Sequence, residues 1–417
     1  MTTDSVRREE GGYSAEPVII PIEQADYWQD PHRVLRAARE QHPVALASSG
    51  EPIILRYADV ERLASDHRII SNALAFIEGQ VASGPLVDWW RLMLTNLNGP
   101  DHRRLRSLVN RAFTPRSVEQ KRSRVRSLTK ELLERHFEAG RLDVIDDFSH
   151  ELPIRLICET LGVPAEHQDA FSVWSTDLGS ALSSVLTPEL QARGEAAARD
   201  LSDAVRDLLR LRRTRPAEDL LSDLIRTAAE LDDPFSDEDL VVLVINLIFG
   251  GHDSSRSMLA VAIALLVQNP AEQDRLRRDP GLAASAGEEV LRYEPIVPVL
   301  ARESTVDLEV AGVEIKAGQP FWLSILASNR DPEVFPDPDG FDITRQGAHS
   351  FSFGWGAHRC LGAAFAQAEI QEAIPAFLAL TQNIELLVDE PRWVPFANLR
   401  RLEKLPISFE PRSDRGR

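Results

Sequence analysis

One long helical pattern, from Ser236 to Asn269, constrains the fold of this chain more than any other stretch. It begins with the sequence SDED, in which Ser236 is an N-cap residue and Asp239 supplies an acid three positions later, and it ends at Asn269-Pro270. At a rise of about 1.5 Å per residue, such a helix is about 50 Å long. A helix of that length crosses a whole domain, so we expect it to be the central helix of a mainly α-helical fold.

The middle of this pattern carries residues that do not suit a buried helix. The segments 240–249 and 259–267 are apolar except for Asn246, but the sequence GGHDSSR lies between them at 250–256. A glycine inside a helix costs up to about 1 kcal/mol relative to alanine, and serine hydroxyls compete for backbone hydrogen bonds. A local conflict of this kind in a central element indicates a functional site.

A second unusual stretch surrounds Cys360, in the sequence SFSFGWGAHRCLGAAFAQA at 350–368. Gly354 and Gly356 allow the backbone to lie flat against a large group, and an alanine-rich helical pattern begins where the loop ends. We expect Cys360 at the N-terminus of that helix, where unpaired N–H groups and the helix dipole lower the pKa of a thiol. A thiolate in such a place is either a nucleophile or a metal ligand.

Haem ligation explains this loop better than zinc, dinucleotide or nucleophile chemistry. His358 and Cys360 are only two ligands, whereas a structural zinc site needs four, and Arg359 occupies the third glycine position of a dinucleotide fingerprint. A nucleophilic Cys360 activated by His358 is physically possible, but it leaves the polar break in the long helix unexplained. A cysteinate that binds haem iron explains the glycine loop, and side chains such as Arg106 and Arg302 could bind the haem carboxylates.

Composition excludes several classes of protein. The formal net charge of −18 argues against a general affinity for nucleic acid or for an anionic membrane. The only cysteines are Cys158 and Cys360, which excludes a disulfide scaffold and favours the reducing cytoplasm. Residues 1–20 are polar and charged, so we expect a flexible tail there, without a signal peptide or membrane anchor. Residues 21–417 contain no repeat or clear linker, so we expect a single domain.

The segment 101–126 is strongly basic. It contains nine Lys and Arg residues against two acidic residues, in a chain whose overall charge is negative. One interpretation is an ordinary solvated helix face. The other is a docking patch for an acidic protein partner.

Four separated segments resemble motifs of the cytochrome P450 family. The sequence FGWGAHRCLG at 353–362 resembles the cysteine-ligand signature, and GGHDS at 250–254 resembles the oxygen-activation segment of the central helix. The sequence NGPDH at 98–102, followed by Arg106, resembles the propionate-binding helix. Glu289 and Arg292 resemble the ExxR motif, whose two residues pair with a later arginine, here Arg345. The resemblance covers about residues 20–412 and implies a helical bundle around haem with small antiparallel β-sheets.

The resemblance also implies a function and the residues that perform it. It implies a monooxygenase that inserts one atom of O2 into an apolar small organic substrate, with electrons from NAD(P)H delivered by a ferredoxin reductase and a ferredoxin. Haem b would be bound through the Cys360 thiolate, Asp253 would relay protons, and Ser254 would donate a hydrogen bond. Other residues implied at the haem are His102, Arg106, Arg302, His358, Phe353, Gly354, Gly250 and Gly251, and those at the substrate are Trp89, Trp90, Phe249, Val297, Val299 and Phe396.

Ser254 departs from the family pattern, which usually has threonine at this position. Serine keeps the hydroxyl but lacks the methyl group that restricts χ1, so the donor is less fixed. We therefore expect oxygen activation that works but is less tightly coupled to product formation.

Two alternative functions stay open at this point. One is a haem-thiolate enzyme of secondary metabolism that performs oxidative coupling, desaturation or peroxide-driven chemistry, although peroxide-driven relatives tend to replace the acid–alcohol pair that Asp253 and Ser254 provide. The other is a non-catalytic haem-thiolate sensor. A sensor would need neither a proton relay nor a docking patch for a reductase.

Overall fold

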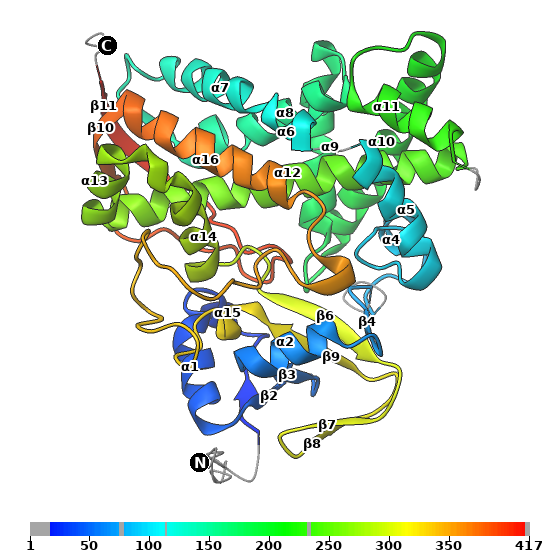
Figure 1. Ribbon diagram of the computed structural model, residues 1–417, viewed down its shortest axis with the longest axis vertical. Helices are drawn as coiled ribbons and strands as arrows, with labels where there is room; N and C mark the ends of the chain where they lie inside the picture. Colours follow the sequence, from blue (N-terminus) through cyan, green and yellow to red (C-terminus); the bar gives the residue numbers. More distant parts are fainter. Residues whose placement is uncertain (1–16, 75–78, 113–114, 232–234, 413–417) are drawn as a thin grey trace, which may run out of the picture.

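The computed structural model describes residues 17–74, 79–112, 115–231 and 235–412, and Figure 1 shows a broad helical part beside a smaller part built on a β-sheet. Helix α12 (Asp237–Gln268) crosses the middle of the helical part. Its N-terminus has the predicted capping box, because the Ser236 hydroxyl accepts the Asp239 N–H at 3.1 Å and the Asp239 carboxylate accepts the Ser236 N–H at 2.9 Å. The prediction of a long central helix is confirmed.

The other helices pack around α12 or cover the sheet. Helices α8, α9, α10 and α16 contact α12 directly. In chain order the α-helices of the described residues, apart from α12, are α1 (Pro31–Gln41), α2 (Tyr57–Ser65), α4 (Pro85–Arg91), α5 (Gly99–Ala112), α6 (Pro115–Glu119), α7 (Arg122–Glu134), α8 (Glu151–Leu161), α9 (Gln168–Ala181), α10 (Pro188–Thr214), α11 (Leu220–Ala229), α13 (Pro270–Arg278), α14 (Ala283–Tyr293), α15 (Ile325–Ser328) and α16 (Ala363–Leu380).

Three sheets bring together strands from distant parts of the chain. The six-stranded sheet has the order β1-β2-β3-β9-β6-β4, a three-stranded sheet has the order β10-β11-β5, and β7 and β8 form a hairpin. The strands are β1 (Ile19–Ile20), β2 (Val44–Ala47), β3 (Pro52–Ile54), β4 (Ile69–Ser71), β5 (Arg141–Asp143), β6 (Val299–Ser304), β7 (Leu308–Val310), β8 (Val313–Ile315), β9 (Pro320–Ser324), β10 (Thr381–Leu386) and β11 (Pro406–Pro411).

The structure differs from the sequence analysis at three places. Strand β5, which pairs with β11, was not expected from the sequence. Ile19 and Ile20 pair with β2, so the tail expected over residues 1–20 extends too far, and residues 1–16 lie outside the described part of the chain. Helix α16 begins at Ala363, three residues after Cys360. No helix of the described residues is both long enough and apolar enough to cross a membrane.

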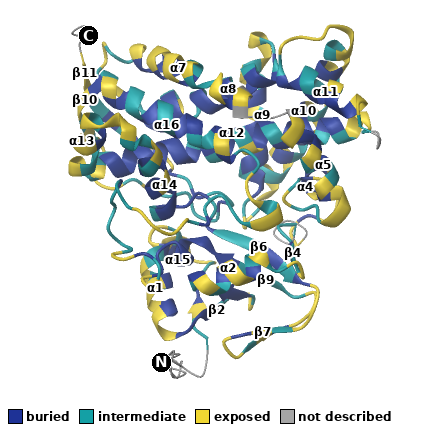
Figure 2. Ribbon diagram, viewed as in Figure 1, coloured by how far each residue is buried: buried dark blue, intermediate teal, exposed yellow. Residues whose placement is uncertain are grey.

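The two apolar halves of α12 belong to different hydrophobic clusters. Residues 240–249 pack with α4, α9, α10 and α11, whereas residues 258–266 pack with α7, α14 and α16. Figure 2 shows the inner faces of these helices as buried. The polar segment 250–257 therefore lies where the two clusters meet, which explains how a stable core tolerates it.

Candidate functional site

The loop that carries Cys360 depends on glycine at two positions. Gly354 and Gly356 have φ values of 67° and 64°, which side chains rarely adopt, and a Cβ at Gly356 would lie 3.0 Å from the backbone oxygen of Ala64. The Cys360 N–H closes the loop by donating to the Phe353 oxygen at 2.6 Å. The sequence therefore folds here into a tight loop that places Cys360 just ahead of α16, where part of the residue reaches the surface although protein atoms crowd around its thiol.

The thiol of Cys360 does not have the lowered pKa that its place before a helix predicted. Enclosure by protein raises the pKa of the thiol, and this effect exceeds the lowering by the Gly362 N–H and by the Arg106 and Arg359 charges. The expectation was wrong for the protein alone, because the two arginine charges and one N–H group do not replace the lost water. A metal cation at the sulfur would supply the missing stabilisation of the thiolate.

One face of α12 opens in the middle of the helix. Leu247, Gly250 and Ser254 are spaced three and four residues apart and are not buried, although their neighbours along α12 largely are. A Cβ at Gly250 would meet nothing within 4 Å, whereas a Cβ at Gly251 would lie 3.3 Å from Ile157 of α8. Gly250 therefore faces open space, and Gly251, expected beside it at the haem, points toward α8 because consecutive helical residues face different directions.

Four basic side chains meet beside the Cys360 loop. The rings of His102 and His358 lie 4.2 Å apart, and Arg106 of α5 donates to the Arg359 oxygen at 2.6 Å. Arg302 of β6 is buried, and its described hydrogen bonds go to the Ala301 oxygen at 2.9 Å and the Ser71 hydroxyl at 3.5 Å. Residues from three distant parts of the chain thus form one cationic cluster, defined as His102, Arg106, Arg302 and His358.

The cationic cluster lacks an acidic partner among the described residues. Burial lowers the pKa of Arg302 to about 10, and burial together with the nearby His102, Arg302 and Arg106 lowers the pKa of His358 to about 3. His358 is therefore neutral at neutral pH, whereas Arg302 stays a buried cation that no acid among the described residues compensates, and such a cation favours binding of an anionic group. These residues, with the Cys360 sulfur and the space at Gly250, fit a haem group, whose two carboxylates the cluster would hold and whose iron the sulfur would bind.

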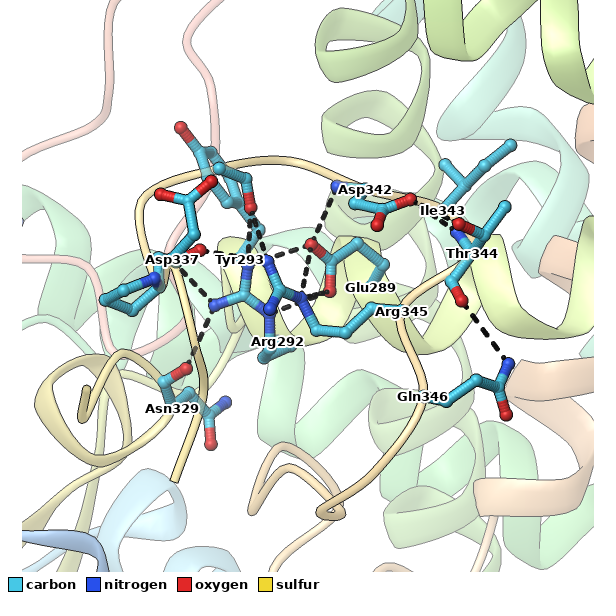
Figure 3. A network of polar contacts seen from close by, with 12 residues as sticks. Glu289, Arg292, Tyr293, Asn329, Asp337, Asp342, Ile343, Thr344, Arg345 and Gln346 are labelled. Carbon is cyan, nitrogen blue, oxygen red and sulfur yellow. Dashed lines mark hydrogen bonds and ion pairs between the residues drawn. The ribbon is translucent and has the colours of Figure 1, made fainter. Parts of the chain in front are cut away.

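A compensated network of charges surrounds Glu289 of α14 (Figure 3). Glu289 of α14 accepts two hydrogen bonds from Arg292, at 2.7 and 2.8 Å, and two from Arg345, at 3.1 and 3.2 Å. The remaining donors of both arginines reach the backbone oxygens of Asn329, Pro336, Asp337, Pro338 and Gly340. The structure therefore brings together the three residues expected from sequence as a triad.

Asn329 connects this network to the loop of Cys360. Its backbone oxygen accepts Arg292 at 3.1 Å, while its side chain donates to the Ser352 hydroxyl at 2.9 Å and accepts the Phe351 N–H at 2.9 Å. Ser352 in turn donates to the Leu291 oxygen of α14 at 2.6 Å. The start of the loop is thus fixed to α14 from two sides, and sequence analysis did not single out Asn329 because no motif marks it.

Asp253 and Ser254 point in different directions from α12. The Ser254 hydroxyl lies on the open face and donates to the Gly250 oxygen at 2.8 Å. The Asp253 carboxylate is buried and forms ion pairs with Arg256 at 3.0 Å and with Arg401 at 3.5 Å. Asp253 and Ser254 are adjacent in sequence, but their side chains do not meet. Transfer of a proton between them therefore requires water or movement of a side chain.

The residues expected at the substrate fall into two groups. Trp89 and Trp90 of α4 are buried, and Trp89 packs edge-to-face on Phe249 at 5.4 Å between ring centres. Val299 and Phe396 line an open cavity between the sheet and the N-terminal segment, whose lining among the described residues includes none of α12 or of the Cys360 loop. Val297 is half-buried, and it is not among the residues that line this cavity. The other residues that line the cavity are mostly apolar and include Tyr27, Trp28, Leu182, Pro298 and Trp322.

Sequence analysis missed an ionisable residue in the core, Glu369 of α16. Its carboxyl is fully buried and accepts a short hydrogen bond from the Ser255 hydroxyl of α12. Burial raises the pKa of Glu369 to about 8. The only sequence signal was an acid at a position of α16 that the helical period places among buried alanines and isoleucines.

Comparisons with known proteins agree with this geometry. The cytochrome P450 family model matches residues 173–280 and 284–390. Vitamin D(3) 25-hydroxylase of Pseudonocardia autotrophica is 34% identical over 93% of this chain and 96% of its own length, and 6-deoxyerythronolide B hydroxylase of Saccharopolyspora erythraea is 33% identical over 92% and 96%.

Solved structures give the same result for the fold. The crystal structure of CalO2 superposes with a TM-score of 0.88 at 31% identity and covers 94% of this chain and 99% of its own. P450BioI, solved in complex with a fatty-acid-ligated acyl carrier protein, superposes with a TM-score of 0.86 at 29% identity over 92% and 100%. The chain therefore belongs to the cytochrome P450 family, as an oxidoreductase that incorporates oxygen from O2 and whose cofactor is haem with a cysteine thiolate ligand.

Proposed function

We propose that this chain is a monooxygenase of secondary metabolism that hydroxylates or epoxidises a largely apolar organic molecule in the cytoplasm, with electrons from a ferredoxin. Haem bound through Cys360 supplies the activation of dioxygen. The observation that carries the proposal is the open face of α12, where Gly250 leaves space and Ser254 presents a hydroxyl. The acid Asp253 is the preceding residue and lies on a buried side of the same helix. Several of the relatives are named as hydroxylases or epoxidases, among them mycinamicin IV hydroxylase/epoxidase of Micromonospora griseorubida.

The cavity supports an apolar substrate. Apart from Ser184, Ser324 and Asn398, its walls are apolar side chains, several of them aromatic. Such a surface binds by removing apolar area from water and orients its ligand through few polar contacts. We expect Val299 and Phe396 to contact the substrate, and Val299→Asp should abolish the substrate-induced spin shift of apolar compounds. An unchanged shift would contradict the assignment of this cavity.

Ser254 would position water for proton delivery. Its hydroxyl is bound to the Gly250 oxygen, and it would exchange that bond for water on the open face when protons are passed from Asp253. The test is the peroxide released per NAD(P)H consumed in wild type, Ser254→Thr and Ser254→Ala, together with incorporation of ¹⁸O from ¹⁸O₂. We expect the lowest ratio for threonine and the highest for alanine, and equal ratios in all three proteins would contradict this role. Product without ¹⁸O would favour coupling or desaturation instead.

The basic segment 101–126 offers a smaller docking surface than the sequence suggested. Arg104, Arg122, Arg124 and Arg126 form ion pairs with Asp239, Glu372, Glu159 and Glu372 of this chain. Arg103, Arg111 and Arg116 are exposed, and Arg359, also exposed, is tied to α5 through Arg106. We propose that these four arginines face an acidic ferredoxin near the thiolate.

Charge reversal tests this partner surface. Arg103→Glu with Arg111→Glu should slow reduction by ferredoxin about tenfold at low ionic strength, and the difference should shrink at high salt because screening removes long-range attraction. Arg126→Glu is the matched control, since Arg126 already pairs with Glu372. Equal effects of the control and the double variant would contradict a local docking site.

A further inference from the structure

Two histidines form a polar contact between α12 and the start of α8, away from the open face of α12. His252 is fully buried, and its Nε2 lies 3.3 Å from Nδ1 of the half-buried His150. Each ring has a serine of α9 at its other nitrogen. The Ser175 hydroxyl lies 3.0 Å from Nδ1 of His252, and the Ser172 hydroxyl lies 2.8 Å from Nε2 of His150.

A π-helical turn places His150 in this contact. The turn η2 (Ile145–Ser149) precedes α8, and the His150 N–H donates to the Ile145 oxygen five residues earlier at 2.9 Å. The turn also contacts α12 directly. Single π turns are frequent at functional sites, because the extra residue redirects the side chain that follows.

Arg256 connects His150 to Asp253. One terminal nitrogen of its guanidinium lies 3.4 Å from Nδ1 of His150, and the other lies 3.0 Å from the Asp253 carboxylate. The carboxylate has little room to turn elsewhere, since Arg401 is 3.5 Å away and a Cβ at Gly179 of α9 would lie 2.7 Å from it. The place of Asp253 thus depends on where Arg256 points.

This geometry determines the proton positions on both rings. A guanidinium can only donate, so Nδ1 of His150 must be an acceptor and its proton must lie on Nε2, toward Ser172. His252 then shares this acceptor with Arg256 by donating from Nε2, and it accepts the Ser175 hydroxyl at Nδ1. Both rings are neutral in this arrangement, in agreement with the lowering of the pKa of each histidine by burial and by Arg256.

We propose that His150 is a positioning residue for oxygen activation, whose neutral ring receives Arg256 and holds that guanidinium on the Asp253 carboxylate. Protonation of His150 removes the acceptor and places two positive groups in contact, which releases Arg256 from this position. The proposal rests on the proposed role of Asp253 as proton relay. It assigns to His150, on a different helix from the acid, a control over how that acid is presented.

The charged groups around His150 set the pH at which this occurs. Arg256 and His252 of α12 disfavour the protonated ring, whereas Asp253 of α12 and the acids Asp146 and Glu151 next to His150 favour it. Helix α9 contributes only the neutral Ser172 to the contact. Burial outweighs the effect of the acids, so His150 becomes protonated only at a pH below the ordinary histidine range.

Two variants of His150 distinguish the loss of the hydrogen-bond acceptor from the loss of the titratable ring. His150→Asn places an amide oxygen near the position of Nδ1 and does not titrate, while His150→Phe removes the acceptor. We expect the peroxide released per NAD(P)H to rise in the wild type as the pH falls from about 8 to 5, and to be about threefold higher for His150→Phe at neutral pH. His150→Asn should recover most of that difference and show a flat profile. A His150→Phe ratio equal to wild type would overturn the proposal.

A spectroscopic measurement tests the ring states without turnover. In ¹⁵N-histidine spectra of the diamagnetic ferrous carbon monoxide complex, His150 and His252 should both carry their proton on Nε2 at neutral pH, with His150 assigned through His150→Asn. A proton on Nδ1 of His150, or a charged ring at neutral pH, would overturn the proposal. An unchanged ratio in Asp253→Asn would refute the relay and this proposal with it, whereas an impaired Asp253→Asn beside a normal His150→Phe would refute the positioning role alone.

Discussion

The loop of Cys360 lies between two clusters of charge that are built in opposite ways. In the network of Glu289, Arg292 and Arg345, the acid and both arginines are satisfied by each other and by backbone oxygens. In the cationic cluster, Arg302 and His358 have no acidic partner among the described residues and their pKa values are lowered. The first arrangement stabilises a fold by itself, and the second is complete only when an anion binds.

This difference gives a physical criterion for separating scaffold from site. A buried charge whose donors are all used has no capacity left for a ligand, whereas an uncompensated charge keeps its desolvation cost until a ligand offsets it. The criterion assigns Arg292 to the scaffold and Arg302 to the site, although both are buried arginines of this chain. Substitutions that remove one charge at a time test it.

The largest effect is expected from Glu289→Gln. The substitution leaves the guanidinium of Arg292 buried without a carboxylate, which should lower the free energy of unfolding by about 3–5 kcal/mol, with or without haem. Urea unfolding of the apo- and holoprotein measures this. Glu288→Gln is the matched control, because Glu288 is exposed and only accepts Gln367, and it should change the unfolding free energy by less than about 0.5 kcal/mol. Similar losses of unfolding free energy in Glu289→Gln and Glu288→Gln would contradict the assignment of the Glu289 network to the scaffold.

Glu369 extends the comparison to an acid, because it is buried and its described partner is the neutral Ser255 and not a cation. Because the pKa of Glu369 is about 8 in the folded chain and lower in the unfolded chain, its contribution to stability is fully present at acid pH and is lost as the pH rises toward 8. Glu369→Gln mimics the protonated acid, so we expect the variant to be more stable than wild type by about 3 kcal/mol near neutral pH and by little near pH 4.

The measurement for Glu369 is the pH dependence of unfolding of both proteins. The two curves should separate progressively on going from acid to neutral pH. Parallel curves would show that the carboxyl ionises normally and that Ser255 or water compensates its charge.

The smallest effect is expected from Arg302→Met. The substitution should stabilise the apoprotein but weaken the binding of haem. Without haem, the variant should be more stable by about 1 kcal/mol, because an uncompensated guanidinium is replaced by an apolar side chain of similar length. With haem, it should bind the cofactor about tenfold more weakly, through loss of a charge-assisted hydrogen bond. Unfolding of the apoprotein and the rate of haem transfer to apomyoglobin give the two values.

Arg39→Met provides the control for this reversal of sign. Arg39 is also buried, but its side chain donates to the Ala327 oxygen at 2.6 Å, under the sheet and away from the cationic cluster. Its substitution should leave the rate of haem loss unchanged. If Arg302→Met lowered both the stability of the apoprotein and the affinity for haem, Arg302 would be part of the scaffold and the criterion would fail.

Sequence motifs located the residues of the site better than they described its electrostatics. The Cys360 loop and the polar break of α12 were found from local patterns, because glycine and charge at fixed spacing leave a local record. The triad of Glu289 was expected from the family resemblance. The pKa of Cys360, the orientation of Gly251 and the internal pairing of Arg122 were not found in this way. Each depends on what another segment places beside the residue.

The sequence by itself determined the helical architecture, the position of the central helix and the place of the cysteine loop, since helix caps, hydrophobic period and glycine act over short distances. Only the tertiary structure decided which buried charges are compensated. Glu369 meets Ser255 across 114 residues, and Arg256 meets His150 across 106, and no local pattern records such contacts. Electrostatic energy depends on distance and on burial, and both are fixed only when the chain has folded.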